Sequence, residues 1–132
     1  MPELRKPAST VRSHFAGTAA MAGGATRFTS LNGGTVTATE SLAQLKARRG
    51  GNLVSLTARV MVASAAGACT VTVRKGGADT AATVTLQGDG TSNEVTWTGT
   101  VAIAADDLLC MELTGAAGSG PTVTWLLEWA QG

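Results

Sequence analysis

Histidine, tyrosine and cysteine are almost absent from this chain. Its 132 residues include one histidine, no tyrosine and two cysteines. The single histidine, His14, excludes histidine-rich metal sites and leaves little material for a histidine-based catalytic triad. We therefore expect a protein that is not an enzyme, with no cofactor and no bound metal.

Charged residues and long apolar runs are scarce as well. Only 14% of residues are charged and the net charge is +1, so we expect neither nucleic acid nor a membrane as a partner. No apolar run reaches the roughly 18–20 residues that span a bilayer. The polar start, with Glu3, Arg5 and Lys6, does not resemble a signal peptide, so we expect synthesis in the cytoplasm with reduced thiols.

Both cysteines have a simple interpretation as small apolar residues of a core or an interface. A bridge between Cys69 and Cys110 is the alternative, and it depends on a Cα separation that the sequence does not give.

What the chain does contain is alternation. Between Gly51 and Leu86, apolar and polar residues alternate with a period of two, in runs that include Val54, Leu56, Ala58, Val60 and Val62, then Cys69, Val71 and Val73, then Ala82, Val84 and Leu86. This period predicts strands with one buried and one wet face. The break Lys75–Asp79 contains Gly76-Gly77, which predicts a tight hairpin. We expect an all-β domain built as an antiparallel β-sandwich.

Further short strands are predicted on either side of this region. They cover 26–31, 35–39, the neighbourhoods of Val95-Trp97 and Val101-Ile103, 108–114 and 122–130. Residues 41–48 fit either a helical turn or a strand edge. The tryptophans share faces with other apolar residues and are expected in the core, and Asp106-Asp107 is expected to shape a turn rather than to act in catalysis.

Two of these strands carry apolar residues on both faces. Leu108 and Cys110 lie opposite Leu109, Met111 and Leu113, and Leu126 lies opposite the face of Trp125 and Leu127. A two-layer sandwich covers only one face of each sheet. We therefore expect Leu108, Cys110 and Leu126 at an interface between copies of the chain. Scattered surface leucines are the alternative.

Residues 1–25 do not resemble a core segment, because prolines, basic residues and small residues dominate them. They are expected to form an extended N-terminal arm, docked on a partner or disordered, before a domain at residues 26–132. A second basic cluster, Lys46, Arg48 and Arg49, is either a solvated loop or a contact for an acidic partner surface.

The turns and strand starts resemble those of small jelly-roll proteins of tailed-phage virions. The similar stretches are 26–28, 32–34, 39–40, 51–53 leading into 58–60, the hairpin 72–80, and Ala104-Ala105-Asp106-Asp107-Leu108-Leu109, where Asp106 replaces the glycine usual in such strand starts. The resemblance covers about residues 26–130.

This resemblance implies a jelly roll that acts as a homotrimer in the virion. It implies a capsid decoration protein on the capsid surface, bound to the major capsid protein or another virion protein, with a tail-fibre or head-fibre domain that binds a host receptor or glycan as the alternative. The arm would be the capsid anchor, through Arg5, Lys6, Arg12, His14 and Phe15. Three weak arm contacts would add up to one tight attachment.

Overall fold

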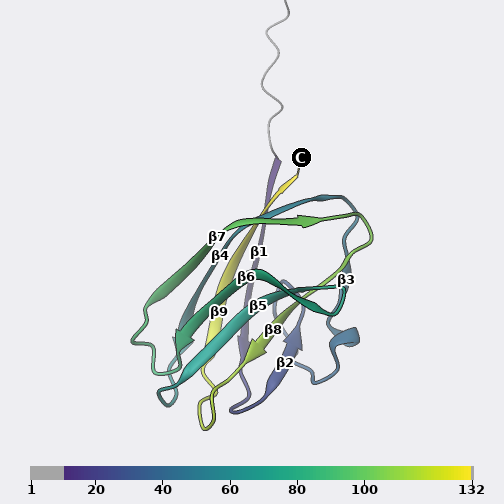
Figure 1. The fold of residues 1–132 in the computed structure, drawn as a ribbon. Helices are drawn as coiled ribbons and strands as arrows, with labels where there is room; N and C mark the ends of the chain where they lie inside the picture. The colour runs from purple at the N-terminus through teal and green to yellow at the C-terminus, as the bar shows by residue number, and fades with distance from the viewer. Residues whose placement is uncertain (1–10, 132) are drawn as a thin grey trace, which may run out of the picture.

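The computed structural model describes residues 11–131 as two antiparallel sheets packed face to face (Figure 1). The strands are β1 (Val11–Ala20), β2 (Thr26–Thr29), β3 (Leu45–Lys46), β4 (Gly51–Val62), β5 (Ala68–Lys75), β6 (Ala78–Gln87), β7 (Glu94–Ile103), β8 (Leu108–Thr114) and β9 (Thr122–Gln131), with one 3₁₀ turn, η1 (Glu40–Leu42). The predicted antiparallel β-sandwich is confirmed. No helix among the described residues is long and apolar enough to cross a membrane.

The first sheet, sheet A, has the strand order β1-β9-β4-β7, and the second, sheet B, has the order β2-β8-β5-β6 with β3 also paired to β8. The pairings are nested along the chain: β1 with β9, β2 with β8, β4 with β7, and β5 with β6. The eight longer strands therefore form one long hairpin rolled into two layers.

The core lies between the sheets and is formed by the alternating residues. Ala82, Val84 and Leu86 of β6 are buried, as are Val123, Trp125, Leu127 and Trp129 of β9. In β4 a register shift between Leu53 and Ser55 moves Leu53 into the core in place of the expected Val54. The alternation therefore predicted the buried faces of β6 and β9. It did not predict this bulge in β4, or the second register shift near its end, where Val62 is 58% exposed.

Turn chemistry follows the sequence closely at two places. Gly76 and Gly77 form the two-residue link between β5 and β6 with φ of 59° and 80°, a conformation that suits the hairpin twist. Asp106 takes the left-handed φ of 74° that glycine would otherwise supply, and Asp107 Oδ2 accepts a hydrogen bond from the Ala104 amide at 2.8 Å. The aspartate pair therefore shapes a turn, as the sequence predicted.

The predicted N-terminal arm needs a correction. Residues 11–20 are not an arm but strand β1, paired with β9 from Val11–Gln131 to Ala20–Thr122. Its small residues are required by packing: a Cβ on Gly17 would lie 2.4 Å from Cζ2 of Trp125. The sequence pattern was misread because small inward residues resemble a linker. Residues 21–25, also part of the predicted arm, form the link from β1 to β2 and include the buried Met21. Residues 1–10, at the start of the predicted arm, lie outside the described residues.

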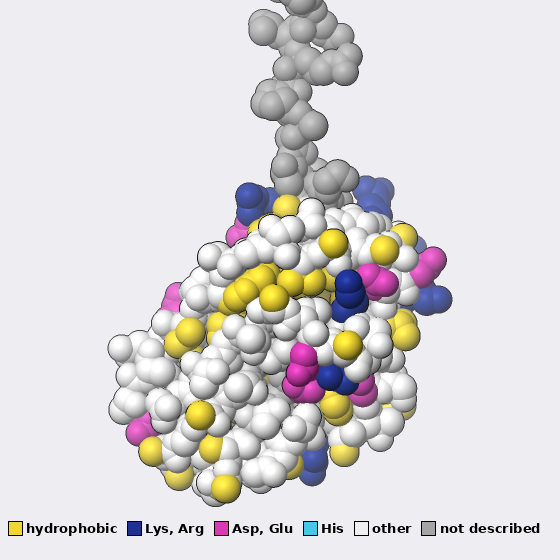
Figure 2. Space-filling model, viewed as in Figure 1, with side chains coloured by type: hydrophobic (Ala, Val, Ile, Leu, Met, Phe, Trp, Pro, Cys, Tyr) yellow, Lys and Arg dark blue, Asp and Glu magenta, His cyan; other side chains and the backbone are white. Residues whose placement is uncertain are grey.

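Three other expectations also change. Residues 35–39, expected as a strand, form only an isolated bridge between Thr37 and Phe28. The two short strands expected at residues 95–97 and 101–103 are a single strand, β7, with an irregular register opposite β4. The ambiguous segment 41–48 holds both of its alternatives, η1 followed by β3. Beside β7 the sheets diverge, and Figure 2 shows hydrophobic side chains in the hollow between β7 and β6.

Candidate partner interface

A groove opens at one corner of the sandwich, between β1, which is an edge strand of sheet A, and β3, which pairs with β8 in sheet B. We call it the corner groove. It has a volume of about 360 Å³ and is lined by Phe15, Leu45, Lys46, Arg48, Arg49 and Trp129. Residues from three separate parts of the chain thus meet in one hollow.

The floor of the corner groove is aromatic. The Phe15 and Trp129 rings lie 6.0 Å apart between centroids, tilted by 34°. Trp129 is fixed from behind, because Gly51 lies against its indole: a Cβ on Gly51 would be 1.9 Å from Nε1. That indole nitrogen is buried without a hydrogen-bond partner among the described residues. The floor is therefore apolar and held rigidly by the fold.

The lip of the corner groove, formed by residues 45–49, is basic and is held in place by backbone hydrogen bonds. Ala47 is buried, and its backbone donates to the Asp107 carbonyl and accepts from the Asp106 amide, both at 2.7 Å. The side chains of Lys46, Arg48 and Arg49 around it are exposed, and none forms an ion pair with a described residue. Leu45 beside them is 53% exposed. Three cations and a leucine therefore face solvent on a well-positioned segment.

Strand β1 forms the opposite wall and is an unpaired sheet edge over part of its length. Among residues 11–131 it pairs on one side alone, with β9, and its far end is covered on the other side, where the Gly34 amide donates to the Thr18 carbonyl. Because Thr18 turns its carbonyl away from β9, the strand period makes Arg12, His14 and Ala16 turn theirs the same way. In the described part of the chain, these backbone groups have no hydrogen-bond partner along the groove.

The predicted anchor residues are divided by the strand. Phe15 points inward and lines the corner groove, whereas Arg12 and His14 lie on the outer face of sheet A. There Arg12 forms an ion pair with Glu128, and His14 Nε2 lies 3.8 Å from Glu128 Oε2. Arg5 and Lys6 lie outside the described residues.

The predicted interface residues are likewise not brought together. Leu126 is 44% exposed on the outer face of sheet A, and Leu108 is 38% exposed on sheet B. Cys110 needs a correction: it is fully buried, and its thiol donates to Glu40 Oε2 at 3.5 Å. The chain's own segment around η1 covers this face of β8, so no second copy is required to bury Cys110. Cys69 and Cys110 are both free thiols.

A second charged site, the Arg74 cluster, lies under that cover and comprises Glu40, Arg74, Asp79, Cys110 and Glu112. The Arg74 guanidinium donates to both Glu40 oxygens at 2.9 and 3.0 Å and to Asp79 Oδ1 at 2.9 Å. Glu112 Oε2 lies 3.5 Å away, and the Phe28 ring centroid is 5.8 Å from the guanidinium carbon. Figure 2 shows charged side chains of both signs gathered on this side.

The Arg74 cluster shifts the pKa values of its acids. Hydrogen bonds from Arg74 lower the pKa of Glu40, whereas burial raises the pKa of Glu112. Burial, with the nearby Glu40 carboxylate, raises the pKa of the Cys110 thiol to about 12. Cys110 therefore stays protonated at neutral pH and is a poor nucleophile.

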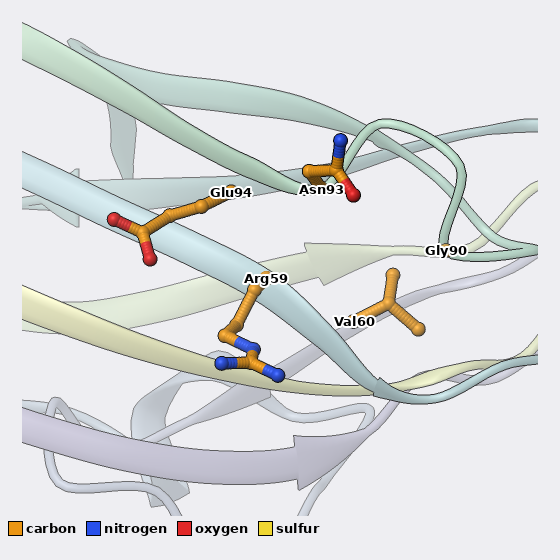
Figure 3. A pocket seen from close by; sticks show the side chains of 5 residues that line it. All are labelled: Arg59, Val60, Gly90, Asn93 and Glu94. Carbon is orange, nitrogen blue, oxygen red and sulfur yellow. The ribbon is translucent and has the colours of Figure 1, made fainter.

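A smaller polar hollow of about 280 Å³ is lined by Arg59, Val60, Gly90, Asn93 and Glu94. Figure 3 shows Arg59 and Glu94 reaching out from neighbouring strands with their charged ends apart, and no ion pair joins them. Among the described residues, no group of three or more histidine, cysteine, aspartate or glutamate side chains could hold a metal ion.

Sequence reasoning found the basic cluster but not its aromatic neighbour. Trp129 was assigned to the core, which is correct at 6% exposure, yet its ring also forms the groove floor. The one signal available was Leu45, an apolar residue without an assigned partner next to three cations.

Comparisons with known proteins give little guidance. No protein-family model matches the chain, and no curated protein matches it. One similar solved structure comes from work described as "Bacillus endospore appendages form a novel family of disulfide-linked pili". It shares 12% identity over 99% of this chain and 100% of that chain, with a TM-score of 0.38. A likeness this low carries no functional meaning.

Proposed function

We propose that the chain is a non-enzymatic structural protein of a phage virion, a capsid decoration protein that attaches to the capsid surface as a trimer. The observation that carries attachment is the corner groove, because it combines an apolar floor, exposed cations that pair with no described carboxylate, and an edge strand with no second neighbour among residues 11–131. Such a surface suits a protein partner.

A jelly roll is part of this proposal, and the strand order supports it. A four-stranded and a five-stranded sheet with nested hairpin pairs, β1–β9 outermost and β5–β6 innermost, are the arrangement expected of a rolled-up double Greek key. Jelly rolls occur in capsid and lectin domains alike, so the fold supports the class of protein and not one role.

The trimer is the second part of the proposal, and exposed leucines support it. Leu126 lies between Ala16 and Thr57 on the outer face of sheet A, where small neighbours leave it prominent. In sedimentation velocity we expect a trimer, weakened by Leu126→Lys. Leu42→Lys is the matched control, because Leu42 is 77% exposed on η1 and away from sheet A. A monomer at micromolar concentration would reject the trimer.

Capsid attachment is tested by co-sedimentation with shells assembled from the major capsid protein of the same virion. We expect saturable binding in proportion to the points of local three-fold symmetry. Binding to host cells or glycans with no binding to shells would favour the fibre-domain alternative.

A further inference from the structure

We propose that the corner groove takes an extended, acidic segment of the partner virion protein, which adds to β1 as a further strand of sheet A. The inference rests on the proposed function for the identity of the partner. It names the chemistry of the contact: backbone pairing along Arg12–Ala16, an apolar side chain on the aromatic floor, and carboxylates facing the basic lip.

The direction of the free backbone groups favours strand addition. Arg12, His14 and Ala16 turn their N–H and C=O groups away from β9, and none of them is hydrogen bonded along that side among the described residues. An added strand would satisfy these groups, and its alternate side chains would point into the groove beside Phe15. The backbone hydrogen bonds would supply most of the affinity, and the groove would determine which side chains of the added strand are accepted.

The other edge of sheet A is less suitable. Strand β7 has an irregular register near Thr98, and the Lys75 ammonium donates to the Ala102 carbonyl at 3.1 Å. A lysine reaching over an edge and a break in the ladder are common protections against strand addition. Edge β1 has no such cover between Arg12 and Ala16 among the described residues.

The charge of the lip favours an acidic segment of another protein over the chain's own residues 1–10. Lys46, Arg48 and Arg49 have no ion-pair partner among the described residues, although Asp106 and Asp107 occupy the adjoining turn. The chain's own residues 1–10 contain Glu3 against Arg5 and Lys6, a basic balance that this lip would repel. An acidic segment from another protein matches the lip.

The test uses short synthetic peptides and the full chain. One fluorescent peptide alternates valine with glutamate, a second alternates valine with lysine, and a third is the glutamate peptide with alternate amides N-methylated. We expect the glutamate peptide to bind, the lysine peptide to bind at least about fivefold more weakly, and N-methylation to abolish binding. In amide hydrogen exchange, the glutamate peptide should protect His14 and Ala16.

Charge variants sharpen the test. Arg48→Glu should weaken the binding of the glutamate peptide about fivefold and should strengthen the binding of the lysine peptide. Arg59→Glu is the matched control, because it makes the same charge change at an exposed residue that lines a different hollow. Equal effects of the two variants would mean that only net charge matters, and that result would overturn the proposal.

Other outcomes identify other occupants. If the outward amides of His14 and Ala16 are already protected without peptide, the edge is occupied by the chain itself or by a second copy, and the proposal is wrong. Shell binding that Arg48→Glu leaves unchanged would retain capsid decoration and reject the groove. Peptide binding with β1 protection but no shell binding would retain the groove and reject capsid decoration.

Discussion

The corner groove and the Arg74 cluster both gather basic side chains next to aromatic rings, but they differ in how those charges are satisfied. Arg74 is bonded to two carboxylates and lies 3.5 Å from a third, with only 18% of its side chain exposed. Lys46, Arg48 and Arg49 are exposed and have no ion pair with any described residue.

This difference indicates that the Arg74 cluster stabilises the fold, whereas the corner groove is available to bind a partner. The Arg74 cluster holds the segment around η1 against β5 and β8. Most hydrogen-bonding groups of its guanidinium already have partners within the chain, so few remain for a ligand. Partly buried charges are expensive to leave unpaired, so the chain supplies their partners itself. Exposed cations cost little to leave unpaired, and they remain available to a partner.

The largest contrast should appear in thiol labelling. At pH 8, a pKa raised from 9.0 to about 12 leaves Cys110 with about a thousandfold less thiolate than in the unfolded chain, and its burial adds to this protection. Cys69, the other free thiol, is fully buried as well, so Ellman's reagent should label the folded protein very slowly. The variant Leu45→Cys, in the corner groove, should add one thiol that reacts at the rate of a free cysteine. Fast labelling of Cys110 in a Cys69→Ala protein would show that the cover over β8 opens readily.

Removing Arg74 should cost far more stability than removing a cation from the lip. Arg74→Met leaves Glu40, Asp79 and Glu112 without their shared counter-ion, and we expect a loss of about 3 kcal/mol in the free energy of unfolding. Arg48→Met should change it by less than about 0.5 kcal/mol. Urea denaturation followed by tryptophan fluorescence measures both. Equal losses would remove the distinction between the two sites.

Replacing the glycine behind the groove floor should reveal that the floor belongs to the core. A Cβ at position 51 would collide with the Trp129 indole and lie 2.7 Å from the Ala130 carbonyl. Gly51→Ala should therefore cost about 2 kcal/mol through overpacking. Gly76→Ala is the contrasting control: no atom lies within 4 Å of its added Cβ, so only the strain of its positive φ would be felt. A Gly51→Ala protein as stable as the wild type would mean that the ring is free to move.

The sequence predicted the inner faces of the strands better than it predicted the site. Alternation in β6 and β9 identifies residues that are buried, because a period of two reports which side of a pleated sheet faces the core. The same reasoning missed β1, since Gly17 and Ala19 are small to make room for Trp125 and other core groups rather than to form a linker.

The site could not be predicted because it depends on register and on long-range neighbours. Nothing in the local sequence places Phe15 next to Trp129 and Arg48, which are separated by most of the chain. Likewise, the second apolar face of β8 was expected to need another copy, but Cys110 is covered by the side chain of Glu40 from the chain's own loop. Loop packing of this kind leaves no periodic signal in the sequence.

The smallest expected effect is the acid dependence of the Arg74 cluster. A carboxyl whose pKa is lowered on folding, such as Glu40, contributes stability above its unfolded pKa of about 4.5 and loses it as the pH falls through its folded value. Glu112, whose pKa is raised, opposes this: its contribution is present at low pH and is lost as the pH rises through its folded value. Glu40→Gln should therefore cost about 1 kcal/mol at pH 7 and progressively less below pH 4.5.

Urea denaturation at a series of pH values measures this difference. Arg48→Met, from the corner groove, is the control and should follow the wild-type curve in parallel, because its charge meets no described carboxylate in an ion pair. If instead Arg48→Met changes the acid dependence as much as Glu40→Gln does, the lip is coupled to an acid of the fold. Its cations would then be a structural feature like Arg74, and they would not be available for a partner.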